Sequence, residues 1–342
     1  MSWKEYRLDN RSIADWLPWE GITHPNIIAN KDDSVFAVLS FEPLPQTANQ
    51  FPIRLPQVKN GWSVWWETQH CDGKAQHFLC LCWNPFFRMN GSLRNALSEK
   101  TLYLRDMEAE FFSVVDALRQ SISEATACRI LEYQELIDFM EFTLSMGAHF
   151  VEMPDTPLDL DALLSQDAGL EFHGNEIRRD DDFLYLVYSL PGSVVDDVSV
   201  RSIFAALSEF SWREVRRMLL FGDAEAQKEL TRYTSRWCPG RKSILDKITE
   251  GLLAEMNGYF SHSLIVCVPK AHERETRGFI DRLFQVSRIP YIREEFNARD
   301  VWWGSLPSLF RANIRPPIVG VSSLDALMPH IDKEEGIAVV PN

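Results

Sequence analysis

The alternation of hydrophobic and polar residues predicts strands in both halves of the chain. Three short runs in the first half are rich in β-branched and aromatic residues, as strands are. These runs are 35–42, 62–67 and 78–83. In the second run Trp62, Val64 and Trp66 should share one face, because strand side chains alternate between two faces. Two further runs, 183–190 and 262–268, are continuously apolar, which is typical of central strands covered on both sides.

Apolar residues spaced three and four apart predict helices between these strands. The clearest helix covers 104–123, and a second covers 133–146 and ends at Gly147. The apolar positions of the first are Met107, Phe111, Val115, Leu118 and Ile122. Later helices are expected from Asp223 to Trp237, from Ser243 to about 256, and over 271–287.

This order of elements predicts an α+β protein with two layered lobes, each a mixed or mostly antiparallel sheet packed with helices. Polar and proline-marked residues from about 152 to 168 separate the two sets of elements. The expected domains are therefore 1–155 and 156–342. The second is expected to end in a proline-rich strand-and-loop segment that includes Trp302 and Trp303.

Composition excludes several classes of protein. With 342 residues and 45% hydrophobic content, the chain is long enough for about two folded domains and is not mostly disordered. Its formal net charge of −14 argues against direct nucleic-acid binding, which needs a surplus of Lys and Arg. No run approaches eighteen uncharged apolar residues, and the opening residues carry no signal-peptide pattern, so a cytosolic chain is expected. Six cysteines lie mostly in apolar runs, which predicts reduced, buried thiols without disulfides.

No catalytic or cofactor-binding residue is expected. The 342 residues contain no G-x-x-x-x-G-K-[ST] motif, whose glycine-rich turn and lysine hold the phosphates of a nucleotide. The nearest imitation, 239–243, is better explained as a helix break with Ser243 as a cap. A nucleophile elbow of the G-x-S-x-G type is also missing from the sequence.

Two clusters have metal-ligand chemistry, but both have simpler interpretations. The first contains His70, Cys71, Asp72, His77, Cys80 and Cys82. Its spacing lacks the paired C-x-x-C pattern of zinc sites, and core packing of the cysteines is favoured. The second, 180–182, is a run of three aspartates for which a solvated hairpin turn is favoured. No metal site is therefore expected, although these clusters are the basis for an alternative function as a cytosolic enzyme of unrecognised type.

A basic stretch is the best candidate for an electrostatic surface. From 213 to 242 there are eight basic residues and four acidic ones, which reverses the sign of the chain average. Its candidate partner-binding residues are Arg213, Arg216, Arg217, Arg232 and Arg236. Such a patch would meet anionic lipid head groups or an acidic partner, whereas the simpler interpretation is a solvated helix face.

Tryptophan pairs near both ends are candidate contact residues. Trp16 and Trp19 belong to an irregular aromatic segment, either packed on the first sheet or used as an interface hot spot. Trp302 and Trp303 pose the same choice.

Short motifs in a fixed order resemble the amino-terminal part of the TrbE/CagE-like ATPases of conjugative type IV secretion systems. In this sequence they are 5–7, 14–19, 30–32, 61–65, 157–167, 236–237, 297–307, 313–317 and 324–329. The resemblance covers about residues 5–330. The regions 41–61 and 251–260 look shorter than the family pattern. In the family, the segment around 297–329 leads into the nucleotide-binding half, so that half is expected to be absent here.

The resemblance implies a non-catalytic scaffold or docking subunit, peripheral on the cytoplasmic face of the inner membrane. It implies a small inner-membrane secretion subunit and other secretion-system subunits as partners, and is compatible with homo-oligomers. A separate P-loop ATPase chain is a further expected partner. A decayed remnant that occupies the place of the ATPase is an additional alternative.

Overall fold

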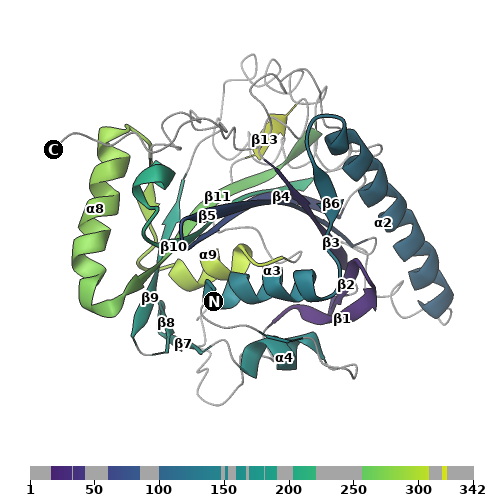
Figure 1. The fold of residues 1–342 in the computed structure, drawn as a ribbon, viewed down its shortest axis with the longest axis horizontal. Helices are drawn as coiled ribbons and strands as arrows, with labels where there is room; N and C mark the ends of the chain where they lie inside the picture. The colour runs from purple at the N-terminus through teal and green to yellow at the C-terminus, as the bar shows by residue number, and fades with distance from the viewer. Residues whose placement is uncertain are drawn as a thin grey trace, which may run out of the picture.

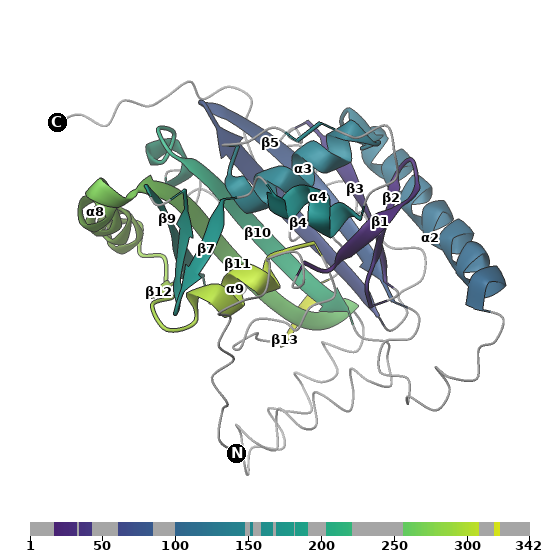
Figure 2. The same cartoon turned by 90° about the horizontal axis from the view of Figure 1, so that it is seen from below.

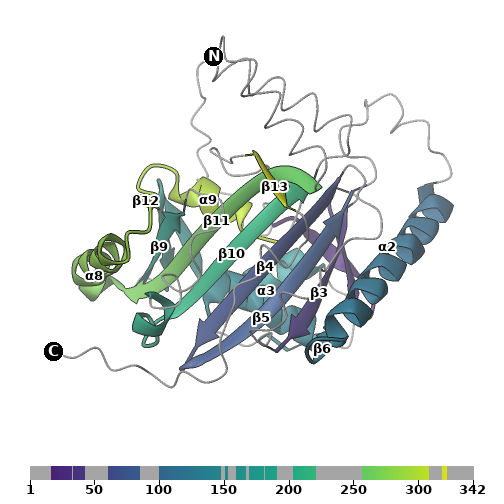
Figure 3. The same ribbon diagram turned by 90° about the horizontal axis from the view of Figure 1, so that it is seen from above.

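One antiparallel sheet organises the protein. The computed structural model describes residues 17–32, 34–42, 61–84, 100–147, 151–152, 159–166, 169–180, 182–190, 203–220, 256–307 and 318–321. Thirteen strands of these residues belong to the sheet, which is strongly curved (Figure 1). Its strands run side by side across the middle of the molecule (Figure 3).

The order of the strands differs from their order in the chain. Along the sheet they are β1 (Trp19–His24), β2 (Ile27–Asn30), β3 (Val35–Phe41), β5 (Lys74–Trp83), β4 (Trp62–Cys71), β10 (Ser211–Leu220), β11 (Met256–Pro269), β9 (Phe183–Ser189), β8 (Glu176–Arg179) and β7 (Leu170–His173). Three short strands pair at the sides: β6 (Cys128–Ile130) with β3, β12 (Ile292–Arg293) with β9, and β13 (Ile318–Val321) with β11.

Helices cover both faces of the sheet. The inner face, under the arch in Figure 1, carries α3 (Gln134–Ser145), α4 (Leu160–Gln166) and α9 (Ala298–Gly304). The outer face carries α2 (Lys100–Ser123) at one end and α8 (Glu273–Val286) at the other, as the view from below also shows (Figure 2). A short 3-10 turn, Lys270–His272, precedes α8.

Hydrophobic periodicity explains how these layers pack. The five apolar positions expected in the first helix are all buried against the outer face, so that prediction is confirmed. Trp62, Val64 and Trp66 join the same core, while Trp65 points to the inner face. Ile280 and Phe284 of α8 fill a separate core at the other end of the outer face. The strands predicted at 35–42, 62–67, 78–83, 183–190 and 262–268 are also confirmed.

The α+β class and the antiparallel pairing agree with expectation, but the described strands form one sheet rather than one per lobe. The sheet continues across the expected boundary because β4 pairs with β10, from Trp212 opposite His70 to Leu219 opposite Ser63. The division into domains 1–155 and 156–342 stays a prediction.

Two local expectations need correction. Residues 211–220, whose charges favoured a solvated helix face, form the central strand β10. Trp302 and Trp303 lie in the helix α9 rather than in a strand or loop. The helices expected at 223–237 and from Ser243 fall outside the described residues.

Within the described ranges, every helix is too short or too polar to span a lipid bilayer.

Candidate functional site

The central strand β10 places charged side chains on both faces of the sheet. Arg213 and Arg217 point to the inner face, whereas Glu214 and Arg216 alternate with them and point to the outer face. All four are at least 96% buried. A strand with these residues at the centre of a sheet is unusual, because burying a charge is costly unless it is paired. The partners of each buried charge therefore explain how β10 tolerates these residues.

Arg213 forms a two-pronged ion pair with Glu67 of the neighbouring strand β4. Its Nε donates to Glu67 Oε1 at 2.8 Å, and its Nη2 donates to Glu67 Oε2 at 3.0 Å. Both side chains are completely buried. Gln69 Nε2 also donates to Glu67 Oε1 at 2.8 Å, so the carboxylate is surrounded by donors. This geometry matches the planar fork of a guanidinium to a carboxylate.

The same face of the sheet caps the carboxyl end of α3. The last carbonyl groups of a helix have no partner within the helix and need donors from elsewhere. Arg213 Nη1 donates to Thr143 O at 3.1 Å, and the Tyr185 hydroxyl donates to Leu144 O at 2.5 Å. Arg179 Nη1 donates to Ser145 O. Cations also suit this end electrostatically, because it carries partial negative charge.

The segment 304–307, which leaves α9 and is called the α9 exit below, is held in a similar way. Arg217 Nη1 donates to Gly304 O at 2.8 Å. Arg213 Nη2 donates to Ser305 O at 3.2 Å. Trp19 Nε1, from the start of β1, donates to Pro307 O at 2.9 Å. Three side chains from two strands thus fix the direction in which the chain leaves α9.

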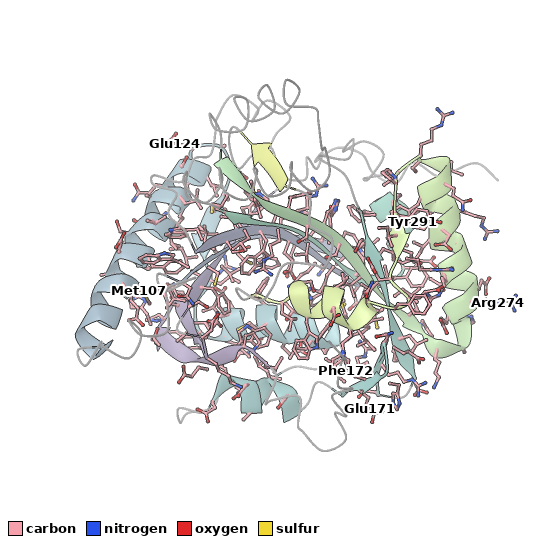
Figure 4. All side chains as sticks on the ribbon, turned by 180° about the vertical axis from the view of Figure 1, so that it is seen from behind. Met107, Glu124, Glu171, Phe172, Arg274 and Tyr291 are labelled. Carbon is pink, nitrogen blue, oxygen red and sulfur yellow. The ribbon has the colours of Figure 1, made fainter. Side chains whose placement is uncertain are left out.

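Aromatic side chains pack α9 against the end of the sheet. Trp302 is fully buried, and Trp303 is half-buried. Phe172 of β7 stacks on Trp303 with ring centroids 5.7 Å apart, and its edge meets Trp302 at 5.5 Å. Phe172 lies just below α9, between Met107 of α2 at one end of the molecule and Arg274 of α8 at the other, and side chains fill the space between α9 and the sheet (Figure 4). The tryptophan pair is therefore largely a packing element.

A second set of buried polar side chains lies on the outer face of the sheet. Glu214 Oε1 accepts a hydrogen bond from Arg216 Nε at 2.8 Å and lies 2.7 Å from His262 Nε2 of β11. Burial alone would raise the pKa of Glu214, but Arg216 and His262 outweigh it and lower this pKa to about 2.

His77 of β5 lies on this outer face too, with Nδ1 3.1 Å from Thr68 Oγ1. Burial lowers the pKa of His77 to about 4, although the nearby Glu214 carboxylate acts in the opposite direction. The imidazole is thus held neutral inside the protein.

The structure corrects the position expected for the basic residues. Arg213, Arg216 and Arg217 are buried in β10 and do not form an exposed patch, because each is used within the fold. Arg232 and Arg236 lie outside the described residues, as does Trp16. Trp19 is buried, as the packing interpretation of its segment predicts. Trp19, Arg213, Arg217 and the tryptophan pair of α9 are nevertheless brought together, at the α9 exit.

The His/Cys cluster of the sequence does not converge. Cys80 and Cys82 point into the inner core, while His77 lies on the outer face of the same strand. His70 stacks on Trp212, and Asp72 sits in the β4–β5 turn with a positive φ of 49°. Within the part of the chain that is described, His, Cys, Asp and Glu form no group of three suited to a metal ion.

The aspartate run lies partly in a turn, and the remaining candidate residues fall outside the described part of the chain. Asp180 and Asp182 lie in the turn between β8 and β9, as the hairpin interpretation predicts. Asp181 and the segment 239–243 are outside the described residues.

Glu67, Tyr185 and Arg179 are the contributors that sequence reasoning missed. Each stands in a strand, but only Tyr185 has apolar neighbours on both sides, which is a signal for a buried polar partner. Glu67 is followed by Thr68, and Arg179 stands between Arg178 and Asp180. Their partners lie in elements that are distant in the sequence, so pattern alone does not pair them.

Comparison with known proteins identifies two relatives. No protein-family model matches the chain. A protein of Rhizobium radiobacter, "Conjugal transfer protein TrbE", is 23% identical over 431 aligned positions, which cover 99% of this chain and 52% of the relative. A protein of Sinorhizobium fredii, named as the second part of a probable conjugal transfer protein TrbE, is 24% identical over 271 positions, which cover 70% of this chain and 40% of the relative.

The chain thus spans about half the length of the curated relatives it matches, or less. Because the first alignment is longer than the 342 residues of this chain, that relative carries additional residues within the matched region.

Proposed function

The chain is related to the TrbE conjugal transfer proteins, and from this relationship we propose that it is a non-catalytic docking or scaffold component of a conjugative type IV secretion system. In this role it would present a rigid surface to other subunits without converting a substrate.

The α9 exit is the observation that carries the proposal. It lies in the segment that, by resemblance, connects the two halves of the longer family members. Three side chains anchor its backbone, from Gly304 to Pro307, to the sheet. A fixed exit is what a scaffold needs in order to place a neighbouring module in one orientation. The 342 residues also lack a P-loop motif, which the ATP hydrolysis expected of the second half requires.

Several partners follow from this role as further elements of the proposal. They are a small inner-membrane secretion subunit, other secretion-system subunits, a P-loop ATPase chain and further copies of this chain. The place of action would be the cytoplasmic face of the inner membrane, by peripheral docking. The name of the Sinorhizobium fredii relative describes it as one portion of a TrbE protein, which supports division of the TrbE role between chains.

The alternative of a cytosolic enzyme finds less support in the geometry. The histidine and cysteine side chains that it would use lie on opposite faces of β5. The aspartates at 180 and 182 lie in a hairpin turn.

Conjugation itself tests the proposed function. Deleting the gene should reduce transfer frequency, and the wild-type chain should restore it and co-purify with secretion-system subunits in the membrane fraction. The purified chain should not hydrolyse ATP above a catalyst-free background. ATP hydrolysis that persists through rigorous purification, or unchanged transfer in the deletion strain, would contradict the proposal.

A matched pair of variants tests the remaining basic residues. Arg232→Glu combined with Arg236→Glu should leave the fold intact. If these arginines meet an acidic surface, the same variant should weaken the recruitment of partners. Arg274→Glu with Arg282→Glu makes the same change of charge at two exposed positions of α8 and serves as the control. Equal loss of recruitment in both variants would point to net charge rather than to a specific patch.

A further inference from the structure

Arg213 contacts the carboxyl ends of two helices that are far apart in the sequence. Its Nη1 donates to Thr143 O in the last turn of α3, and its Nη2 donates to Ser305 O in the α9 exit. Glu67 fixes the guanidinium from a third direction. One planar group therefore sets the positions of both helix ends relative to the sheet.

Each helix end also has a contact that it does not share with the other. The Tyr185 hydroxyl binds Leu144 O of α3, and Arg217 binds Gly304 O of the α9 exit. These contacts allow either end to be perturbed by a substitution that leaves Arg213 in place. Arg213 is the side chain common to both.

The geometry of a guanidinium makes the two contacts interdependent. Its donors lie in one rigid plane, so a rotation that follows one carbonyl turns the other donor away from its acceptor. Arg213 is completely buried, and water does not reach the donor that loses its partner. Leaving a buried charged donor unsatisfied is costly, which favours both contacts being formed or both being broken.

We infer that Arg213 is a positioning residue that couples α3 to the α9 exit, so that the two helix ends open and close as one unit. Displacement of the chain beyond α9 is then transmitted to α3 through the guanidinium. Trp19 extends the coupled unit to β1, because its indole holds Pro307 O. The coupling depends on contacts within the chain, so it can be measured on the purified protein whatever that protein binds.

Hydrogen exchange of backbone amides, read by mass spectrometry, tests the coupling. The test variant combines Arg213→Met with Glu67→Gln, which removes the shared contacts without leaving a buried carboxylate unpaired. Amides of 142–146 and of 301–306 should both exchange faster, by on the order of tenfold. Their protecting bonds include Met146 N to Phe142 O and Ser305 N to Trp302 O.

Two single variants test the coupling itself, because each removes a contact of one end and leaves Arg213 in place. Tyr185→Phe and Arg217→Met should each speed exchange in both 142–146 and 301–306. In the background of Arg213→Met with Glu67→Gln, each should speed exchange further at its own end only. Amides of α2 and β5 report the rest of the sheet and should stay protected in all variants. Acceleration of a single end by Tyr185→Phe or by Arg217→Met, with Arg213 present, would overturn the coupling. Equal acceleration in α2 and β5 would overturn it as well, since Arg213 would then stabilise the whole sheet instead of linking two helix ends.

Discussion

Glu67 and Arg213 pair face to face in the interior, with two hydrogen bonds of 2.8 and 3.0 Å and no exposure of either side chain. This pair lies between two central strands and beneath two helices, so both strand pairing and helix placement depend on it.

Removing one member of this pair should destabilise the protein more than removing both charges. Arg213→Met leaves a buried carboxylate uncompensated and should lower the free energy of unfolding by about 3–5 kcal/mol. Adding Glu67→Gln should recover part of that loss. Denaturant unfolding followed by circular dichroism measures both variants. The interpretation fails if the double variant is no more stable than Arg213→Met alone.

Glu214 should contribute to the acid sensitivity of the fold. Its pKa falls from 4.5 to about 2 on folding, so its contribution is fully present above pH 4.5 and is lost as pH falls through about 2. By linkage this contribution is about 3 kcal/mol. Urea unfolding at a series of pH values should show wild type losing its advantage over Glu214→Gln as pH falls through this window. A constant difference between the two proteins would argue against the depressed pKa.

His77 should affect the stability of the fold at less acidic pH than Glu214 does. Its pKa of about 4 lies below the ordinary 6.5, so between these values the unfolded chain binds a proton that the native protein excludes. Native stability should therefore decrease as pH falls from 6.5 towards 4, with about 2 kcal/mol lost to this residue at pH 5. His77→Gln should show a smaller drop in melting temperature between pH 7 and pH 5. Identical drops would mean that the buried imidazole accepts a proton in the native state.

Two glycines should respond in opposite directions to the same substitution. A Cβ at Gly258 of β11 would stand 2.3 Å from Leu219 O of β10, so Gly258→Ala should push the strands apart at a cost on the order of 1–3 kcal/mol. A Cβ at Gly278 of α8 meets no atom within 4 Å. Gly278→Ala should instead stabilise the helix by about 0.5–1 kcal/mol. Thermal unfolding of the two variants checks both signs, and destabilisation by Gly278→Ala would contradict the open surroundings of that position.

Residues with a clear period were predictable from the sequence. The helix α2 was visible because its apolar residues recur on one stripe from Met107 to Ile122. The strands β3, β5 and β9 were visible because their runs are short, apolar and rich in aromatic or β-branched residues. The local pattern of apolar residues determines these elements, and packing in the folded protein only completes the burial of their side chains.

The strand β10 was not predictable in the same way. Arg213, Glu214, Arg216 and Arg217 are consistent with a solvated surface as long as their partners are unknown. Glu67, His262 and the helix-end carbonyls that neutralise or satisfy them come from other regions of the chain. Tertiary contacts therefore override local propensity here, and the candidate site depends on them. The residues of the α9 exit were named from the sequence, but their arrangement around backbone carbonyls was not.

The path of the chain through the sheet has a consequence for synthesis on the ribosome. The strand β4 ends at residue 71, and its neighbour β10 begins only at residue 211. While the intervening residues are translated, the nascent chain carries β4 with one edge unpaired and the Trp-rich face of that strand without its final neighbours. Such an edge is a template for pairing with other chains. Fragments that stop before residue 211 should therefore aggregate when they are expressed, and the native sheet closes late, when β11 pairs with both β10 and β9.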